Sequence, residues 1–165
     1  MMRPVNDEEQ KKLYSGKRKC HTKKNLIVIQ QSKRIEYLSP TVDGTIHDKK
    51  LADICELEYP KDSDLMDDSG FQGHTPENCE ILRPFKKQKG KDLTPYQKAW
   101  NRLISRVRVG VKHVICSVKR CHAVQDTIRL ELEDVEDLVM EISCGLHNFR
   151  LRLDPWLSLP EPGGI

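Results

Sequence analysis

The residues best suited to chemistry are two adjacent carboxylates, Asp67 and Asp68, which follow the apolar pair Leu65-Met66 and precede Ser69-Gly70. A carboxylate at the end of a buried strand, released by a glycine, projects into the crevice where α/β sheets bind ligands. Hard cations such as Mg²⁺ take oxygen ligands, and paired ions support in-line attack on phosphodiesters. Taken alone, the pattern is more typical of a simple turn at a strand end.

Basic side chains gather in three runs, and the acids collect elsewhere, in 62–68 and 131–141. This segregation favours a phosphate-binding surface with a separate acidic pocket, although solvated loops and helix faces also explain each run taken singly. The net charge of +3 does not by itself require nucleic acid. The three runs are Lys17, Arg18, Lys19, Lys23 and Lys24; Lys86, Lys87, Lys89 and Lys91; and Arg102, Arg106, Arg108, Lys112, Lys119 and Arg120.

Short apolar runs and helical spacing predict the elements that would position these residues. Strands are expected at 26–29, 35–38, 65–66 and 81–82, with a short helix over 47–56 and a basic loop over 85–93. Adjacent strands followed by alternation with helices predict an α/β fold built on a mixed sheet.

Two helices should follow the basic loop. Thr94-Pro95-Tyr96-Gln97 forms a capping box, and apolar residues then recur at helical spacing from Tyr96 to Val118. We expect that stripe to lie in the core. A second helix should follow, with one apolar face that consists of Val135, Leu138, Val139, Ile142, Leu146 and Phe149.

Length and composition predict one domain with a highly charged surface. The chain has 165 residues, of which 37% are hydrophobic and 32% charged, above the usual quarter. The six cysteines contain no CxxC pair, which favours reduced, mostly buried thiols in the cytoplasm. No apolar run has the length of a membrane span, so a membrane is not an expected partner.

Several segments together resemble Harbinger-like insertion-sequence DDE transposases of bacteria. The resemblance covers about residues 12–156 and extends to motif order and spacing. Its segments are 14–25 (YSGKRKCHTKKN), 44–50 (GTIHDKK), 68–73 (DSGFQG), 93–109 around NRLISRVRV, and 144–150 (CGLHNFR).

The resemblance implies an RNase H-like fold in which an Asp, an Asp and a Glu bind two Mg²⁺ or Mn²⁺ ions and cut DNA at transposon ends. By position, Asp68 matches the second aspartate and would be a metal ligand, with Asp67 as a spectator. His47-Asp48 matches a motif that we interpret as structural. For DNA contacts we expect Lys17, Arg18, Lys19, Lys23, Lys24, Lys86, Lys87, Arg106, Arg108 and Lys119.

Two departures from the family pattern argue against catalysis. Lys112 stands where the family has its glutamate, and an ammonium group repels a cation instead of binding it. The first aspartate belongs to a DGTE strand that would precede the basic signature and is absent here. Asp43-Gly44-Thr45 resembles that strand in letters only, because it falls at a turn.

We therefore expect a flexible stub over 1–11, a truncated RNase H-like catalytic domain over 12–154 and a disordered tail over 155–165. The mixed sheet would lack its first central strand and be followed by long C-terminal helices. The expected function is that of an inactive, truncated DDE transposase. The alternative is a catalytically dead DNA-binding fragment that regulates an intact transposase. A further alternative is an enzyme completed by a half encoded upstream.

Overall fold

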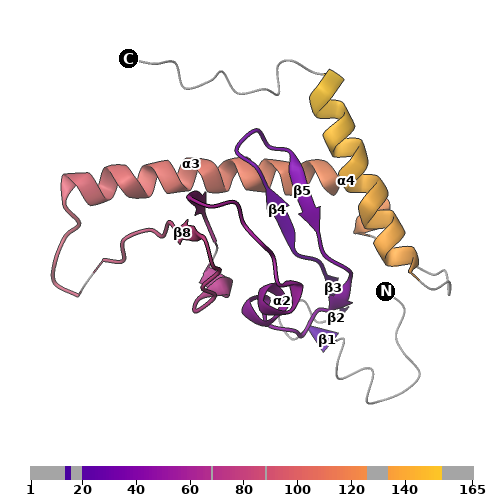
Figure 1. Ribbon diagram of the computed structural model, residues 1–165, viewed down its shortest axis with the longest axis horizontal. Helices are drawn as coiled ribbons and strands as arrows, with labels where there is room; N and C mark the ends of the chain where they lie inside the picture. The colour runs from indigo at the N-terminus through magenta and orange to yellow at the C-terminus, as the bar shows by residue number, and fades with distance from the viewer. Residues whose placement is uncertain (1–13, 16–19, 68, 88, 126–133, 154–165) are drawn as a thin grey trace. The chain divides into compact units, whose positions relative to one another are not determined.

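The computed structural model describes residues 14–15, 20–67, 69–87, 89–125 and 134–153 (Figure 1). The chain divides into two compact units. Unit 1 contains Met1–Ile46 and Val111–Ile165, and unit 2 contains His47–Gly110. The expected stub over 1–11 and the expected tail over 155–165 lie outside the described residues.

Three antiparallel strand pairs occur in unit 1. β1 (Tyr14–Ser15) pairs with β2 (Cys20–His21), and β3 (Lys23–Lys24) pairs with β6 (Val42–Asp43). β4 (Ile27–Ile29) pairs with β5 (Ile35–Leu38) across a turn in which Lys33 has φ 69°. The predicted strands at 26–29 and 35–38 are thus confirmed as a hairpin.

The core of unit 1 lies where this hairpin meets two helices. Buried Ile35 packs with Val114 and Val118, from the end of α3 (Pro95–Val118), and with Cys144 of α4 (Val135–Leu153). Around them lie Ile27, Ile29, Leu38, Val124 and Met140. The β-branched residues that predicted the strands are therefore the ones that hold the helices.

The second predicted helix is confirmed as α4, but most of its apolar face is exposed. Val135 is buried, and the other buried residues of α4 are Ser143, Cys144 and His147. A large apolar stripe remains between 51% and 66% exposed; it consists of Leu138, Ile142, Leu146, Phe149 and Leu153. Hydrogen bonds explain why this apolar face is exposed. His147 and its neighbour Asn148 bind the backbone of the hairpin, and these contacts fix the rotation of α4 about its axis.

The described part of unit 2 contains a short helix, a parallel strand pair and residues 95–110 of α3. α2 (Asp48–Cys55) matches the helix predicted over 47–56, and the side chain of its N-cap His47 accepts a hydrogen bond from the Lys49 N–H. β7 (Ser63–Leu65) runs parallel to β8 (Cys79–Ile81), and the short 3₁₀ helix η1 (Ser69–Phe71) lies between them in sequence. Both predicted strands are confirmed, shifted by one or two residues towards the N-terminus.

The start of α3 confirms the capping box. The Gln97 N–H donates to Thr94 Oγ1 at 3.2 Å, and the Thr94 N–H donates to Gln97 Oε1 at 3.0 Å. The predicted apolar stripe is buried only in part: Ile104 is 2% exposed, whereas Tyr96 is 70% exposed. Capping is a local property, which the sequence encodes directly, while burial depends on what packs on each turn.

The mixed α/β class is confirmed, with long helices at the C-terminal end. We expected one mixed sheet, but the described strands form four two-stranded sheets. The expectation of mostly buried thiols is also wrong, because only Cys144 is buried and both Cys20 and Cys116 are exposed. No helix in the described ranges is both long and apolar enough to cross a membrane.

Candidate metal site and nucleic-acid interface

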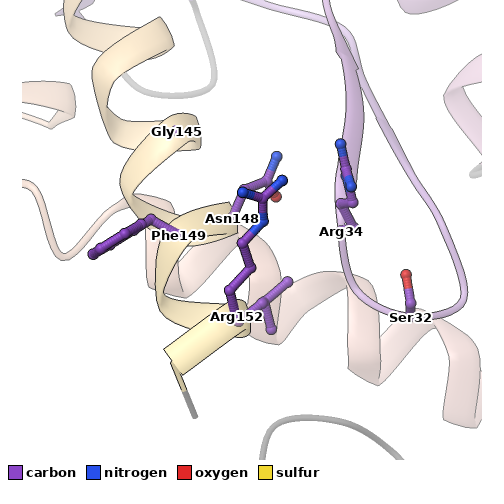
Figure 2. Close-up of a pocket in the computed structure, with 7 residues that line it drawn as sticks. Ser32, Arg34, Gly145, Asn148, Phe149 and Arg152 are labelled. Atoms are coloured by element: carbon purple, nitrogen blue, oxygen red, sulfur yellow. The ribbon is translucent and has the colours of Figure 1, made fainter. Parts of the chain in front are cut away.

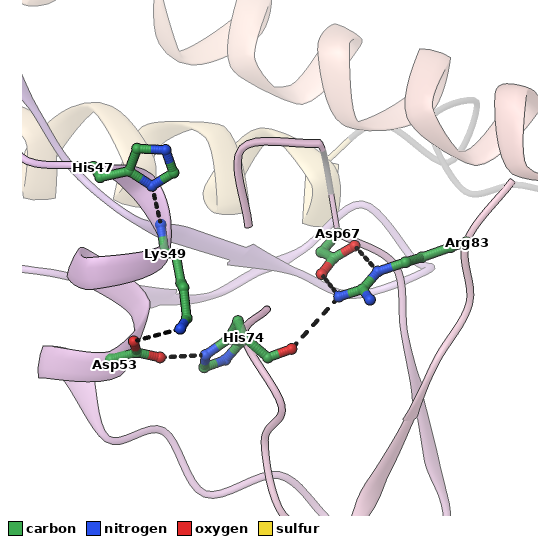
Figure 3. A network of polar contacts seen from close by, with 6 residues as sticks. All are labelled: His47, Lys49, Asp53, Asp67, His74 and Arg83. Atoms are coloured by element: carbon green, nitrogen blue, oxygen red, sulfur yellow. Dashed lines mark hydrogen bonds and ion pairs between the residues drawn. The ribbon is translucent and has the colours of Figure 1, made fainter. Parts of the chain in front are cut away.

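Asp67 lies just after β7 and is held by Arg83, which follows β8. The Arg83 guanidinium donates from Nε to Oδ1 at 3.2 Å and from Nη2 to Oδ2 at 2.8 Å (Figure 3). The Asp67 side chain is only 6% exposed. Hydrogen bonding to this carboxylate raises the pKa of Arg83 above its usual value. Both carboxylate oxygens of Asp67 therefore accept hydrogen bonds from the Arg83 guanidinium.

The loop that follows is packed against the N-terminal part of α2. A Cβ atom on Gly70 would lie 2.5 Å from Asp48 Oδ2, so the carboxylate fits there only because residue 70 lacks a side chain. Gly73, at φ 85°, lies beside the Lys49 side chain. His74 Nδ1 is 2.8 Å from Asp53 Oδ1 (Figure 3).

These contacts give the His47-Asp48 segment a structural role in unit 2. Asp48 and Lys49 touch the two glycines, and Asp53 binds His74, so α2 supports the loop at three points. Arg83 adds a fourth contact, from Nη2 to the His74 carbonyl at 3.5 Å. Sequence reasoning did not identify Asp53, His74 or Arg83. The spacing of Lys49 and Asp53, four residues apart on a helix, was the one available signal.

Asp68, the predicted metal ligand, lies outside the described residues. Lys112 is exposed on α3 and belongs to unit 1, whereas Asp67 belongs to unit 2. In the part of the chain that the structure describes, no three His, Cys, Asp or Glu side chains are grouped as a metal site would require.

The first predicted basic run has mainly structural contacts where it is described. Lys17, Arg18 and Lys19 lie outside the described residues. Lys23 Nζ pairs with Glu136 Oε1 at 2.9 Å, and Lys24 Nζ donates to the Ile46 carbonyl at 2.6 Å. These two lysines therefore tie β3 to other parts of unit 1.

The other predicted DNA contacts are more open to solvent. Lys86 and Lys87 are exposed in the basic loop, where Lys87 Nζ lies 2.6 Å from Asp92 Oδ1. Arg106 and Arg108 are exposed on α3, and Lys119, just beyond its end, is half-buried. Arg106 and Arg108 are two residues apart, so their side chains lie on opposite sides of α3, and their role in DNA binding stays a prediction.

The Asp43-Gly44-Thr45 segment is a strand end followed by a turn. Asp43 is the last residue of β6 and lies opposite Lys23. The Gly44 N–H donates to the Thr22 carbonyl at 2.8 Å, and a Cβ at Gly44 would lie 2.5 Å from that oxygen. A glycine is thus required at residue 44 because the Thr22 backbone lies so close, which agrees with the turn predicted from the sequence.

The fold and these residues define a mixed α/β protein with a carboxylate-ended parallel strand pair and an exposed basic helix. A family model described as DDE superfamily endonuclease matches residues 1–148. The chain belongs to the DDE superfamily endonuclease family, which confirms the resemblance stated from its motifs.

One curated relative is a protein of Microchaete diplosiphon named "Probable transposase for insertion sequence element IS702". It is 31% identical to this chain over 146 residues, which cover 88% of this chain and 52% of the relative. The chain therefore spans about half the length of that relative. No solved structure shows a significant match.

Proposed function

We propose that this chain is a DDE transposase polypeptide that binds DNA through its phosphates and does not cut DNA by itself. Family membership supports the DNA-handling part, and the observation that carries the inactive part is the lysine at residue 112. The chain resembles the C-terminal part of the family's catalytic domain, and in that resemblance residue 112 occupies the place of the third acid.

The residues present do not fit the Mg²⁺ or Mn²⁺ ions that the family implies. A divalent ion needs several oxygen donors in one place, and Lys112 brings an ammonium group instead. Asp67 cannot act as a metal ligand in place of another acid without losing its hydrogen bonds to Arg83, which donates to both of its oxygens.

An RNase H-like domain over residues 12–154 is part of this proposal, with a stub over 1–11 and a tail over 155–165. The antiparallel hairpin β4–β5 and the parallel pair β7–β8 support it, because a mixed sheet of this kind contains both sorts of pairing.

Nuclease activity tests the inactive part directly. The purified chain should leave a labelled duplex with transposon-end sequence uncut in Mg²⁺ or Mn²⁺. Cutting by the unaltered chain that Asp68→Ala abolishes would refute the proposal.

DNA binding is tested through its salt dependence. Counterion release makes the logarithm of affinity fall linearly with the logarithm of salt concentration, by about 0.9 for each phosphate neutralised. Arg106→Gln and Arg108→Gln, made singly, should lower the slope by about one unit for the arginine that faces the DNA, since residues two apart lie on opposite sides of α3. Failure to bind any duplex at low salt would reject the DNA-binding part.

A regulatory fragment that acts on an intact transposase of the same family is the second candidate. The observation that favours it is the exposed apolar stripe of α4, a surface that monomeric proteins usually cover. Co-expression with an intact relative, followed by affinity purification, should recover a complex. Leu146→Glu should abolish the complex, whereas the equally exposed polar control Arg150→Glu should not.

A further inference from the structure

A hollow of about 530 Å³ lies in unit 1 between the turn of the β4–β5 hairpin and the C-terminal half of α4 (Figure 2). The hairpin contributes Ser32 and Arg34 to its lining. The helix contributes Gly145, Asn148, Phe149, Leu151 and Arg152. None of these residues is acidic, and two are arginines from opposite walls.

The two walls are fixed to each other by side-chain hydrogen bonds. Asn148 Oδ1 accepts from the Ile35 N–H at 2.9 Å, and Asn148 Nδ2 donates to the Ile35 carbonyl at 2.9 Å. His147 Nε2 lies 3.0 Å from the Lys33 carbonyl oxygen. The spacing between hairpin and helix is therefore set by part-buried contacts and needs no ligand to form. Such preorganisation lowers the entropy cost of binding.

The guanidinium groups determine what this hollow would bind. Arg34 Nε pairs with Glu36 Oε1 at 3.3 Å, which orients the side chain and leaves its two terminal nitrogens as further donors. Arg152 reaches towards the hollow from the last turn of α4 (Figure 2). Planar guanidinium forks from two sides match the tetrahedral oxygens of a phosphate.

Base recognition is not built into this place. Figure 2 shows the Phe149 side chain directed away from Arg34, so no aromatic face lies between the two arginines. The remaining lining atoms that can donate are the Ser32 hydroxyl and amide N–H groups. This chemistry suits the backbone of a nucleic acid and carries no sequence information.

We propose that this hollow holds a phosphodiester of bound DNA between Arg34 and Arg152. The proposal deepens the DNA-binding part of the proposed function and rests on it. It adds a contact from the turn of the β4–β5 hairpin and from α4 that is distinct from the basic runs of the sequence.

The main experiment compares three single variants of the full chain. Arg34→Gln and Arg152→Gln each remove one lining charge, and Arg150→Gln is the matched control. Arg150 lies on the same exposed turn of α4 and does not line the hollow. Binding is measured by fluorescence anisotropy on a short labelled duplex across a salt series. All three side chains are exposed, so unchanged circular dichroism is expected and is checked first.

Each lining variant should lower the affinity for DNA, uniformly across DNA sequences, and the control should lower it by much less. Because both arginines hold one phosphate, the double variant Arg34→Gln/Arg152→Gln should lower the salt slope by about one unit. Glu36→Gln should strengthen binding, because it removes the acid that pairs with Arg34. Equal losses of affinity for Arg150→Gln and Arg152→Gln would mean diffuse surface charge and would overturn the proposal. Unchanged affinity in both lining variants, or an unchanged slope in the double variant, would overturn it as well.

A second measurement separates this proposal from the proposed function. Inorganic pyrophosphate, titrated into the isotope-labelled chain, should shift the Asn148 side-chain amide signals, and the double variant Arg34→Gln/Arg152→Gln should lose that shift. A chain that binds no DNA yet shows the pyrophosphate shift would refute the DNA-binding function but retain the anion site. A chain that binds DNA without any shift at Asn148 would refute the anion site alone.

Discussion

Two asparagines, each of which hydrogen-bonds both backbone groups of one residue, permit a direct test of how burial sets the strength of a hydrogen bond. Asn148 bonds both the N–H and the carbonyl of Ile35, at 2.9 Å each. Asn101 does the same to Phe85, at 2.8 and 3.0 Å. The chemistry is identical, but Ile35 is 6% exposed whereas Phe85 is 42% exposed.

Replacing each asparagine by alanine should therefore give unequal costs. Asn148→Ala leaves two buried backbone groups without partners, and at about 1–3 kcal/mol for each unsatisfied group the loss should be roughly 2–6 kcal/mol. Asn101→Ala exposes its partner groups to water, which replaces the lost bonds, so its cost should be about 0.5–1 kcal/mol. A loss of the first size is a large fraction of the stability of a typical domain.

Urea titrations followed by NMR would measure both costs, with amide signals of each unit read separately because the two asparagines belong to different units. Hydrogen exchange at the Ile35 amide should accelerate strongly in Asn148→Ala. If Asn101→Ala costs as much as Asn148→Ala, burial does not control these bonds and the reasoning fails. Retention of Ile35 protection in Asn148→Ala would refute it independently.

Three further predictions concern single sites. Gly110→Ala should stabilise α3 by about 0.5–1 kcal/mol in thermal melts, since a Cβ there meets nothing within 4 Å, whereas Gly44→Ala should destabilise unit 1 because its Cβ would strike backbone. Burial raises the pKa of the Cys144 thiol. The protonated thiol therefore contributes fully to stability at pH values below its pKa in the unfolded chain. This contribution is lost as the pH rises through the pKa of the thiol in the folded chain. The midpoint of unfolding should thus fall more steeply with alkaline pH for the unaltered chain than for Cys144→Ala. Iodoacetamide should modify exposed Cys116 well before buried Cys144, which mass spectrometry would detect. Leu146→Glu should leave the melting temperature nearly unchanged and reduce light scattering on heating, because that side chain is 52% exposed; a drop of many degrees would contradict the rotation found for α4.

The sequence by itself determined the local elements and the family. Branched apolar runs marked the hairpin strands, and the reciprocal Thr94–Gln97 bonds followed from residue types three apart. The order of the motifs pointed to the DDE superfamily endonuclease family, which the comparisons show. These features depend on neighbours in sequence or on inherited spacing, so they can be read without coordinates.

Tertiary structure alone decided which groups meet. Two such pairs are Asp67 with Arg83 and Asp53 with His74. Their members are 16 and 21 residues apart, and these spacings do not predict a contact. The rotation of α4 was set by Asn148 reaching the Ile35 backbone, 113 residues away, and this overrode the apolar pattern that favoured another face. A buried backbone group must find a partner, and that requirement outweighed the burial of one hydrophobic stripe.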